Sequence, residues 1–242
     1  MIPSLLYHLV GLFIYFGLEK LPSYTDYWTT SGDTFTLYGR SFAGRGMISR
    51  NRFYSLWSFL HVSDPDTKDL TDRLCKVCPI IEHLNHVSER YFQPGREISI
   101  DEWMVTSKGR FPMRQYIKNK PAKWGFKLWC LCDSKTGYTY RFALYRGKQG
   151  EIRSDKGLAY DDVTELVQGL ENQGYCLYTD NFYSSPTLFK YLKTKGFEAC
   201  GTVDTSRRDP PPPSLKPQKA ELGKRNIERG EGRWVRDGDI VR

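Results

Sequence analysis

Two aspartates stand where a carboxylate can serve catalysis. Asp101 follows the strand-like run Ile98-Ser-Ile, and Asp180 follows the strand-like run Leu177-Tyr-Thr. A carboxylate at the end of a strand can face a cleft shared with a neighbouring strand, and Mg2+ prefers oxygen ligands of this kind. Phosphoryl transfer by two metal ions needs several such carboxylates from separate strands. The sequence therefore indicates a candidate Mg2+ site at Asp101 and Asp180, provided that the fold brings them together.

A plainer interpretation stays open, because strand-terminal aspartates are commonly surface or capping residues. Glu102 is adjacent to Asp101 and would point to the opposite face of a continuing strand, so it is less suited to the same site. Asn181 offers an amide oxygen, but capping of the following turn is the favoured role. Spacing alone does not decide between these interpretations.

Positive charge is concentrated in one segment. The chain has 36 basic and 28 acidic side chains, and eleven of the basic ones lie between Lys108 and Lys148 beside a single acid, Asp133. Because neutralising the phosphate backbone supplies most of the non-specific affinity for DNA, this segment predicts a nucleic-acid contact. A solvated basic face without a partner is the alternative.

The elements that must position these residues follow from hydrophobic periodicity. Helical spacing dominates residues 5–96, and Ser49 is suited to cap one of the helices. From Glu97 onward short strand-like runs predict a sheet. The expected order is three strands (98–105, 126–132, 138–145), a helix (161–173), a strand (175–179), a helix (186–194) and a strand (197–203). This order predicts an α/β fold, a mixed sheet flanked by helices.

Three regions are therefore expected: a helical region over residues 1–96, the sheet domain over residues 97–204, and a proline-rich linker with the start of a further element over residues 205–242.

The apolar run Leu5 to Leu18 is too short to span a bilayer and lacks the flanks of a signal peptide, so a buried helix is expected. The six cysteines lack a disulfide framework and predict reduced, buried thiols in an intracellular protein. Cys75-x-x-Cys78 is only half of a zinc motif, and zinc is not expected there.

Several ordered motifs carry a family resemblance. The run Ser99-Ile-Asp-Glu-Trp-Met-Val-Thr-Ser-Lys-Gly-Arg110 is followed by Gln115-Tyr-Ile-Lys-Asn-Lys-Pro121, Gly125-Phe-Lys-Leu-Trp129, Tyr178-Thr-Asp-Asn-Phe-Tyr-Ser-Ser185 and Cys200-Gly-Thr-Val203. Together they closely resemble the transposase domain of the piggyBac family. With the helical part upstream, the resemblance covers most of residues 5–232.

The resemblance implies an RNase H-like fold in which three aspartates bind two Mg2+ ions for DNA strand cleavage and transfer at TTAA-type sites. Asp101 matches the first aspartate and Asp180 the second. The third belongs to a Trp-x-Asp-Lys segment beyond an Arg-Gly-Glu motif. Arg229-Gly-Glu231 is present here, but Asp237 and Asp239 lack that context. We therefore expect an incomplete, truncated catalytic core that is inactive on its own.

The same resemblance gives the basic segment a role on DNA. The residues expected to contact phosphates of transposon ends are Lys108, Arg110, Arg114, Lys118, Lys120, Lys123 and Lys127. Trp103, Tyr116 and Trp124 are candidates to stack on splayed bases. A nuclear protein, a possible homodimer and no membrane association are expected. The alternatives are a domesticated, non-catalytic DNA-binding or interaction protein, and a transposon relic without a function.

Overall fold

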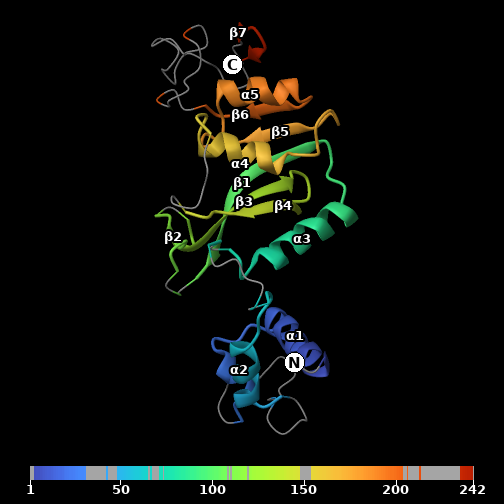
Figure 1. Cartoon of the computed structure of the whole chain (residues 1–242), viewed down its shortest axis with the longest axis vertical. Coiled ribbons are helices and arrows are strands. Elements are labelled where there is room, and N and C mark those ends of the chain that lie inside the picture. The colour runs from blue at the N-terminus through green and yellow to red at the C-terminus, as the bar shows by residue number, and fades with distance from the viewer. Residues whose placement is uncertain are drawn as a thin grey trace, which may run out of the picture. The chain divides into compact units, whose positions relative to one another are not determined.

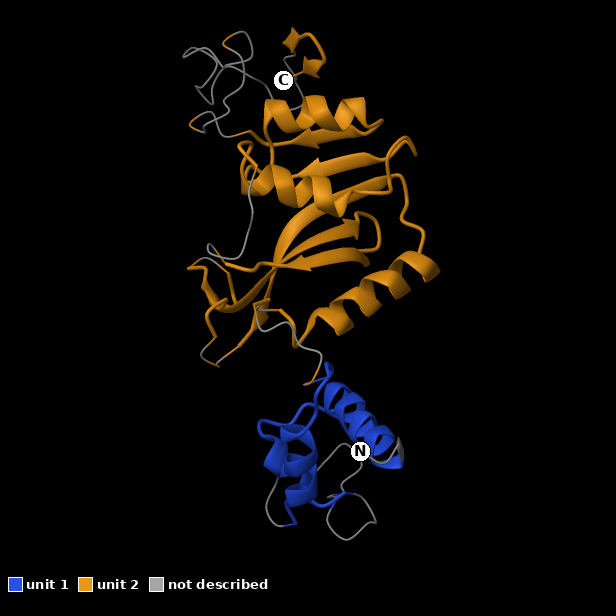
Figure 2. Cartoon of the chain, viewed as in Figure 1, with its two compact units in different colours: residues 1–64 blue, residues 65–242 orange. Residues whose placement is uncertain are grey.

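The computed structural model describes residues 3–30, 42, 48–64, 66, 71–72, 74–107, 109, 111–118, 120–147, 154–203, 206, 213 and 235–241. Contacts divide the chain into two compact units, residues 1–64 and 65–242 (Figure 2). The sequence places the change from helices to strands at residue 96, inside the second unit. The helix α3 (Cys78–Tyr91) belongs to that unit because it packs along a strand of the sheet.

The first unit is built from the helix α1 (Pro3–Leu18), a 3-10 turn η1 (Tyr24–Trp28) and the helix α2 (Arg50–Ser58). The helical stripe of α1 is buried in an aromatic core that includes Tyr27 and Phe53. Ser49 caps α2 as predicted, since its hydroxyl accepts the N–H of Arg52 at 3.4 Å. None of the helices formed by the described residues is long and apolar enough to cross a membrane.

The second unit contains a six-stranded mixed sheet (Figure 1). Its strands are β1 (Glu97–Thr106), β2 (Gln115–Tyr116), β3 (Trp124–Asp133), β4 (Thr139–Leu144), β5 (Cys176–Thr179) and β6 (Glu198–Gly201). The order is β2-β3-β1-β5-β6, and β4 also pairs with β3. β1 runs antiparallel to β3 and parallel to β5, and β6 is parallel to β5. The predicted mixed sheet flanked by helices is confirmed.

Two helices bury their apolar sides against one face of this sheet. They are α4 (Leu158–Leu166) and α5 (Pro186–Thr194). Ile100 of β1 and Trp129 of β3 share a core with Leu166 of α4 and Leu188 of α5. Alternation along β1 explains this, because its even-numbered positions up to Ile100 face the core while Asp101 is exposed. The core face therefore fixes which side of β1 presents the aspartate.

The helix predicted over residues 161–173 is shifted in the structure, where α4 begins at Leu158 and ends at Leu166. Glycines with positive φ angles bracket it: Gly157 at 94° precedes the first turn and Gly169 at 84° follows the last. Left-handed backbone cannot continue a helix, and glycine adopts it without steric cost. These glycines, rather than the apolar spacing, set the bounds.

The hairpin between β3 and β4 is organised by one buried acid. Asp133 accepts hydrogen bonds from the N–H of Gly95 at 2.8 Å, and from the N–H and the hydroxyl of Thr136, both at 2.7 Å. These bonds, led by the Thr136 hydroxyl, lower the pKa of the Asp133 carboxyl. Asp133 thus has a structural role in the turn between the two strands.

The helix α3 covers the outer edge of the sheet. The side-chain amide of Asn85 donates to the carbonyl of Phe142 at 2.8 Å, and its oxygen accepts the Phe142 N–H at 3.0 Å. Glu89 forms an ion pair with Arg141 at 2.6 Å. Pairing with a helix satisfies backbone groups that an exposed edge strand would leave open.

The C-terminal residues form a hairpin of β7 (Arg236–Asp237) and β8 (Ile240–Val241) next to α5. Asp239 forms an ion pair with Lys193 of α5 at 2.6 Å. The hairpin lies where the start of a further element was expected. The predicted linker, apart from Ser206 and Pro213, and the Arg229-Gly-Glu231 motif lie outside the described residues.

Candidate metal centre and DNA-binding surface

The sheet register brings the two predicted aspartates together. Ile100 of β1 lies opposite Thr179 of the parallel strand β5, so Asp101 and Asp180 are the next residues of two adjacent strands. Neighbouring strands lie about 4.8 Å apart. Carboxylate oxygens of Asp101, Glu102 and Asp180 lie within 4.8 Å of one another. A separation of 79 residues in the chain thus becomes direct proximity.

The participation of Glu102 differs from the expectation that it would point away. β1 does continue past it to Thr106, and Glu102 is partly buried while Asp101 is exposed, so the strand alternation holds. Its carboxylate nevertheless joins the two aspartates. Strand alternation alone did not reveal this.

The turn that carries Asp180 is held by hydrogen bonds beneath it. Oδ1 of Asp180 accepts the N–H of Phe182 at 2.9 Å, so Asp180 itself, rather than Asn181, caps this turn. The fully buried Ser184 donates to the carbonyl of Asp180 at 2.7 Å and contacts the Thr179 hydroxyl at 2.8 Å. A turn so restrained holds the Asp180 carboxylate next to β1.

Gly201 of β6 completes this support. A Cβ at that position would lie 2.2 Å from the Ser184 hydroxyl and 2.5 Å from the carbonyl of Thr179. Neither contact is tolerable, so only glycine lets β6 approach the turn this closely. Gly201 of the Cys200-Gly-Thr-Val203 motif therefore lets β6 pack against the turn that carries Asp180.

Lys127 lies beside the carboxylates rather than on an open surface. Its ammonium is 3.7 Å from the ring centroid of Trp129 and 4.8 Å from that of Phe182, and the two rings stack at 5.6 Å. Burial lowers the pKa of Lys127, and the nearby charges of Glu102 and other acids oppose that shift. This lysine, which was predicted to contact DNA, occupies an aromatic cage inside the site. Contact with DNA stays a prediction.

A buried phenol adjoins the same acids. Tyr183 is 1% exposed, and its hydroxyl has no hydrogen-bond partner among the described residues. Burial raises the pKa of Tyr183 far above its ordinary value, and the charges of Glu102, Asp101 and Asp180 contribute. The phenol therefore stays neutral and keeps a proton to donate.

This arrangement fits a hard divalent cation. Three carboxylates offer oxygens at close range, and a buried O–H with a hydrogen bond to give lies next to them. Asp237 and Asp239 are not part of this group, and among the described residues no other three acids, histidines or cysteines bring their ligand atoms this close together. The residues that could hold a cation are thus Asp101, Asp180 and Glu102.

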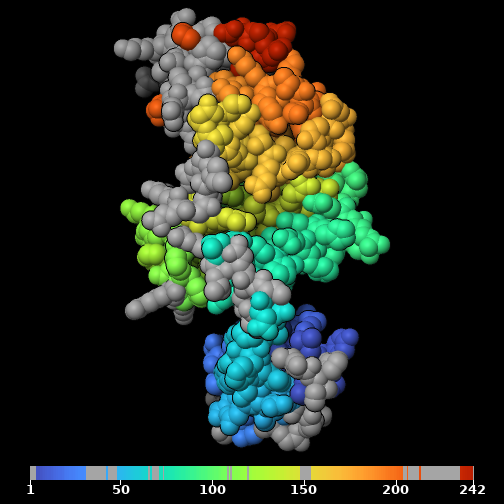
Figure 3. All heavy atoms as spheres, viewed as in Figure 1, coloured from blue at the N-terminus to red at the C-terminus, as the bar shows by residue number. Residues whose placement is uncertain are grey.

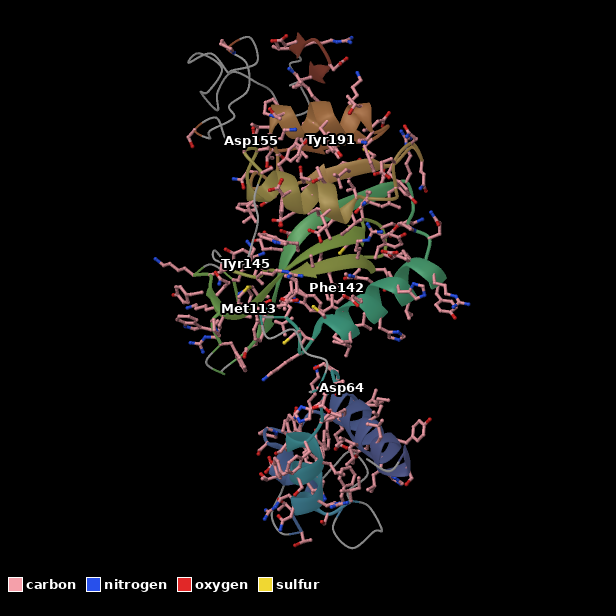
Figure 4. The ribbon with its side chains drawn as sticks, viewed as in Figure 1. Asp64, Met113, Phe142, Tyr145, Asp155 and Tyr191 are labelled. Atoms are coloured by element: carbon pink, nitrogen blue, oxygen red, sulfur yellow. The ribbon has the colours of Figure 1, made fainter. Side chains whose placement is uncertain are left out.

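Of the other predicted DNA contacts, the structure describes Arg114, Lys118, Lys120 and Lys123, which lie around β2 and the start of β3 (Figure 3), where the buried Met113 marks the segment in Figure 4. Lys118 and Lys123 are exposed. The guanidinium of Arg114 stacks over Trp124, 4.4 Å from its centroid, and Lys120 pairs with Glu102 at 3.2 Å. Lys108 and Arg110 lie outside the described residues. The described residues of the basic segment therefore include exposed side chains and side chains that contact an aromatic ring or a carboxylate of the same chain.

The aromatic candidates of this surface are all accessible. Trp103 is 59% exposed, Tyr116 is 52% exposed and Trp124 is 49% exposed. None of the three therefore packs in the core. Tyr116 and Trp124 contact each other across the β2–β3 pair, with centroids 4.8 Å apart. Half-exposed rings next to exposed lysines suit contact with a nucleic acid.

The six cysteines, all of them described, are unpaired thiols. Cys130 is buried, and burial raises its pKa to about 12. Cys200, in contrast, is exposed, so the expectation of buried thiols is wrong at that position. It lies on β6, the edge strand of the sheet order, which leaves one of its sides open.

Comparison with known proteins gives consistent matches. A transposase family model, described as Transposase IS4, matches residues 4–235. PiggyBac transposable element-derived protein 3 of Homo sapiens is 27% identical over 233 residues, which are 95% of this chain and 37% of that protein. PiggyBac transposable element-derived protein 2 of Homo sapiens is 28% identical over 207 residues, 83% of this chain and 33% of the relative.

A solved structure agrees with these matches. The cryo-EM structure of a piggyBac transposase synaptic complex with hairpin DNA superposes with a TM-score of 0.78 at 25% identity, covering 98% of this chain and 48% of that one. The chain thus spans less than half the length of each of these relatives. Because one family model covers residues 4–235 and the fold and the motif order agree with it, the chain belongs to the piggyBac-type family of transposases.

Proposed function

We propose that this chain is a transposase-derived protein that binds DNA, and that its ancestral reaction is Mg2+-dependent strand cleavage and transfer at TTAA-type sites on an RNase H-like core. The convergence of the carboxylates of Asp101, which lies within β1, and Asp180, which directly follows the end of β5, carries this proposal. The family adds support, because the solved relative is a transposase bound to hairpin DNA. Nuclear localisation and a homodimer belong to the same proposal, and imaging of a tagged chain and sedimentation would test them.

Each residue of the proposed site has a separate role. Asp101 and Asp180 would hold the divalent cation, which when bound activates a water and polarises the phosphodiester. The hydrogen bonds of Ser184 keep the Asp180 turn in place. Lys127 offsets part of the negative charge from within its aromatic cage. The exposed Lys118 and Lys123 would hold the DNA backbone near the site.

Metal binding is the first test. Isothermal titration of Mn2+ into the 242-residue chain should show a site that Asp101→Asn and Asp180→Asn each remove and that Asp239→Asn leaves intact. Asp239 is the matched control because it pairs with Lys193 outside the carboxylate group. A wild-type chain that binds no Mn2+ at millimolar concentration would refute the proposed site.

Cleavage is the second test. A strand-cleavage assay with Mg2+ or Mn2+ on matched transposon ends reports on turnover. Since Asp239 is engaged with Lys193 and the described carboxylate group holds only two of the matched aspartates, we expect this chain to bind cation and DNA without cleaving. Robust cleavage that Asp101→Asn abolishes would establish the enzyme and refute the inactivity.

A non-catalytic DNA-binding protein is the second candidate function, and the exposed lysines beside half-exposed aromatic rings favour it. It predicts salt-sensitive affinity for duplex DNA that survives Asp101→Ala. Absence of DNA binding at low salt would remove both this function and the DNA-dependent part of the first.

A further inference from the structure

An ion pair joins Lys120, which lies between β2 and β3, to Glu102 of β1. The ammonium lies 3.2 Å from Oε1 of Glu102 and also donates to the carbonyl of Glu102 at 3.3 Å. The two side chains are 31% and 16% exposed. Lys118 and Lys123 in the same segment are exposed. Of the lysines at positions 118, 120 and 123, Lys120 is thus the one whose ammonium contacts a carboxylate of this group.

The carboxylate that Lys120 contacts is shared with the candidate metal centre. An oxygen of Glu102 lies within 4.8 Å of oxygens of Asp101 and Asp180. Three negative groups at such distances repel one another, and one ammonium offsets part of that repulsion. A divalent cation among the same oxygens would repel the ammonium, so the cation and Lys120 compete for Glu102.

The other lysine near the cluster does not take this role. The ammonium of Lys127 lies over the rings of Trp129 and Phe182, and the ion pairs among the described residues include Lys120 with Glu102 but none with Lys127. Lys120 lies between β2 and β3, in the segment whose exposed lysines would meet the DNA backbone. It therefore connects the DNA-facing segment to the carboxylates.

We propose that Glu102 is a third carboxylate ligand of the cation site and that Lys120 is its counter-ion while no divalent cation is bound, so that divalent cation and DNA phosphate bind cooperatively. This inference rests on the proposed function, because it presupposes cation binding at Asp101 and Asp180. A phosphate that engages Lys120 leaves Glu102 available to the cation. A cation on Glu102 likewise leaves Lys120 available to a phosphate, and the two effects are equal by linkage.

The test is a Mn2+ titration of the full 242-residue chain at low ionic strength, followed by calorimetry and by the Mn2+ paramagnetic resonance signal. Glu102→Gln should weaken Mn2+ binding roughly tenfold, as loss of a charged ligand does, whereas Lys120→Gln should tighten it roughly threefold to tenfold by removing the competing charge. Lys118→Gln, the same change at an exposed neighbour, is the matched control and should shift the affinity less than about twofold. In a Glu102→Gln background, Lys120→Gln should have no further effect.

Coupling to DNA is the second readout. A saturating duplex should tighten Mn2+ binding of the wild-type chain, Mn2+ should tighten duplex binding by the same factor, and both factors should fall to one in Lys120→Gln. Lys120→Arg keeps the charge and should retain the coupling, and this second variant decides the matter if Lys120→Gln does not fold by circular dichroism.

The outcomes separate the two levels of the proposal. Wild-type protein that binds no Mn2+ overturns the proposed cation site, and this inference with it. Mn2+ binding that Asp101→Asn removes but that Glu102→Gln and Lys120→Gln leave unchanged overturns the role of Glu102 and Lys120 alone. Equal tightening by Lys120→Gln and Lys118→Gln would reduce the effect to general surface charge and also overturn it.

Discussion

The division of the basic segment into exposed and engaged lysines predicts which of them govern DNA affinity. Lys118 and Lys123 are exposed, whereas Lys127 is enclosed by Trp129 and Phe182. A lysine that neutralises a backbone phosphate releases a counterion, and each such contact contributes about 0.9 to the slope of log affinity against log salt concentration. We expect the two exposed lysines to carry this dependence.

The magnitude follows from the number of contacts removed. The double variant Lys118→Gln/Lys123→Gln should lower the magnitude of the slope by about 1.8. Raising the salt concentration from 50 to 200 mM should therefore reduce the DNA affinity of the variant by a factor roughly twelve times smaller than the factor for wild type. Lys127→Gln should leave the slope within about 0.3 of wild type, because a caged ammonium releases no phosphate counterion. Fluorescence anisotropy of a labelled duplex across that salt range measures both.

The matched control is Lys135→Gln. Lys135 is an exposed lysine of the β3–β4 turn, and the length of β3, roughly 30 Å, separates it from Lys123. Its removal should not change the slope. The reasoning fails if Lys127→Gln or Lys135→Gln reduces the slope as much as the double variant does.

Three further outcomes follow from the packing. Gly201→Ala should destabilise the second unit by about 1–3 kcal/mol in urea unfolding, because its Cβ would lie 2.2 Å from the Ser184 hydroxyl, and Cys200→Ala should cost little in comparison. The pKa of Asp133 is lower in the folded protein than in the unfolded chain, so wild type should be more stable than Asp133→Asn. This difference in unfolding free energy should be complete above the unfolded pKa and should disappear as pH falls through the folded pKa. A difference that grows in acid would contradict this. In native protein iodoacetamide should modify the exposed Cys200 first and Cys130 last, which mass spectrometry of timed samples will show; early labelling of Cys130 would mean that β3 opens readily.

Local chemistry predicted much of the fold. The bounds of α5 agree with the expectation at both ends, because Ser185 caps the helix, Pro186 occupies its first position and Gly196 follows it with a φ of 77°. The bounds of α4 were not predicted, because apolar spacing continued past Leu166 while Gly169 turned the chain. β2 escaped prediction because it has only two residues, and pairing with β3 rather than local propensity defines it.

The two aspartates of the candidate site were predictable, but only Asp180 follows the end of a strand, because β1 continues past Asp101 to Thr106. Asp101 and Asp180 stand out because each follows a buried run, and the sheet then places them side by side. The approach of Glu102 was not accessible in the same way, since alternation describes where a side chain starts and not where its oxygens end. Nor does the sequence distinguish the caged Lys127 from the exposed Lys118, because that difference depends on the ring of Phe182 more than fifty residues away.

The parallel pairing of β1 with β5 also bears on how this protein tolerates change. Pairing of Glu97–Ile100 with Cys176–Thr179 sets the gap between the two aspartates, so the surface loops that lie between them in the sequence do not set it. Lengthening or replacing one of those loops, such as the turn after Asp133, should leave the distance unchanged. A register slip of one residue, in contrast, would turn one aspartate toward the opposite face of the sheet. Divergence among relatives can therefore accumulate in loop length while four paired residues on each strand stay aligned.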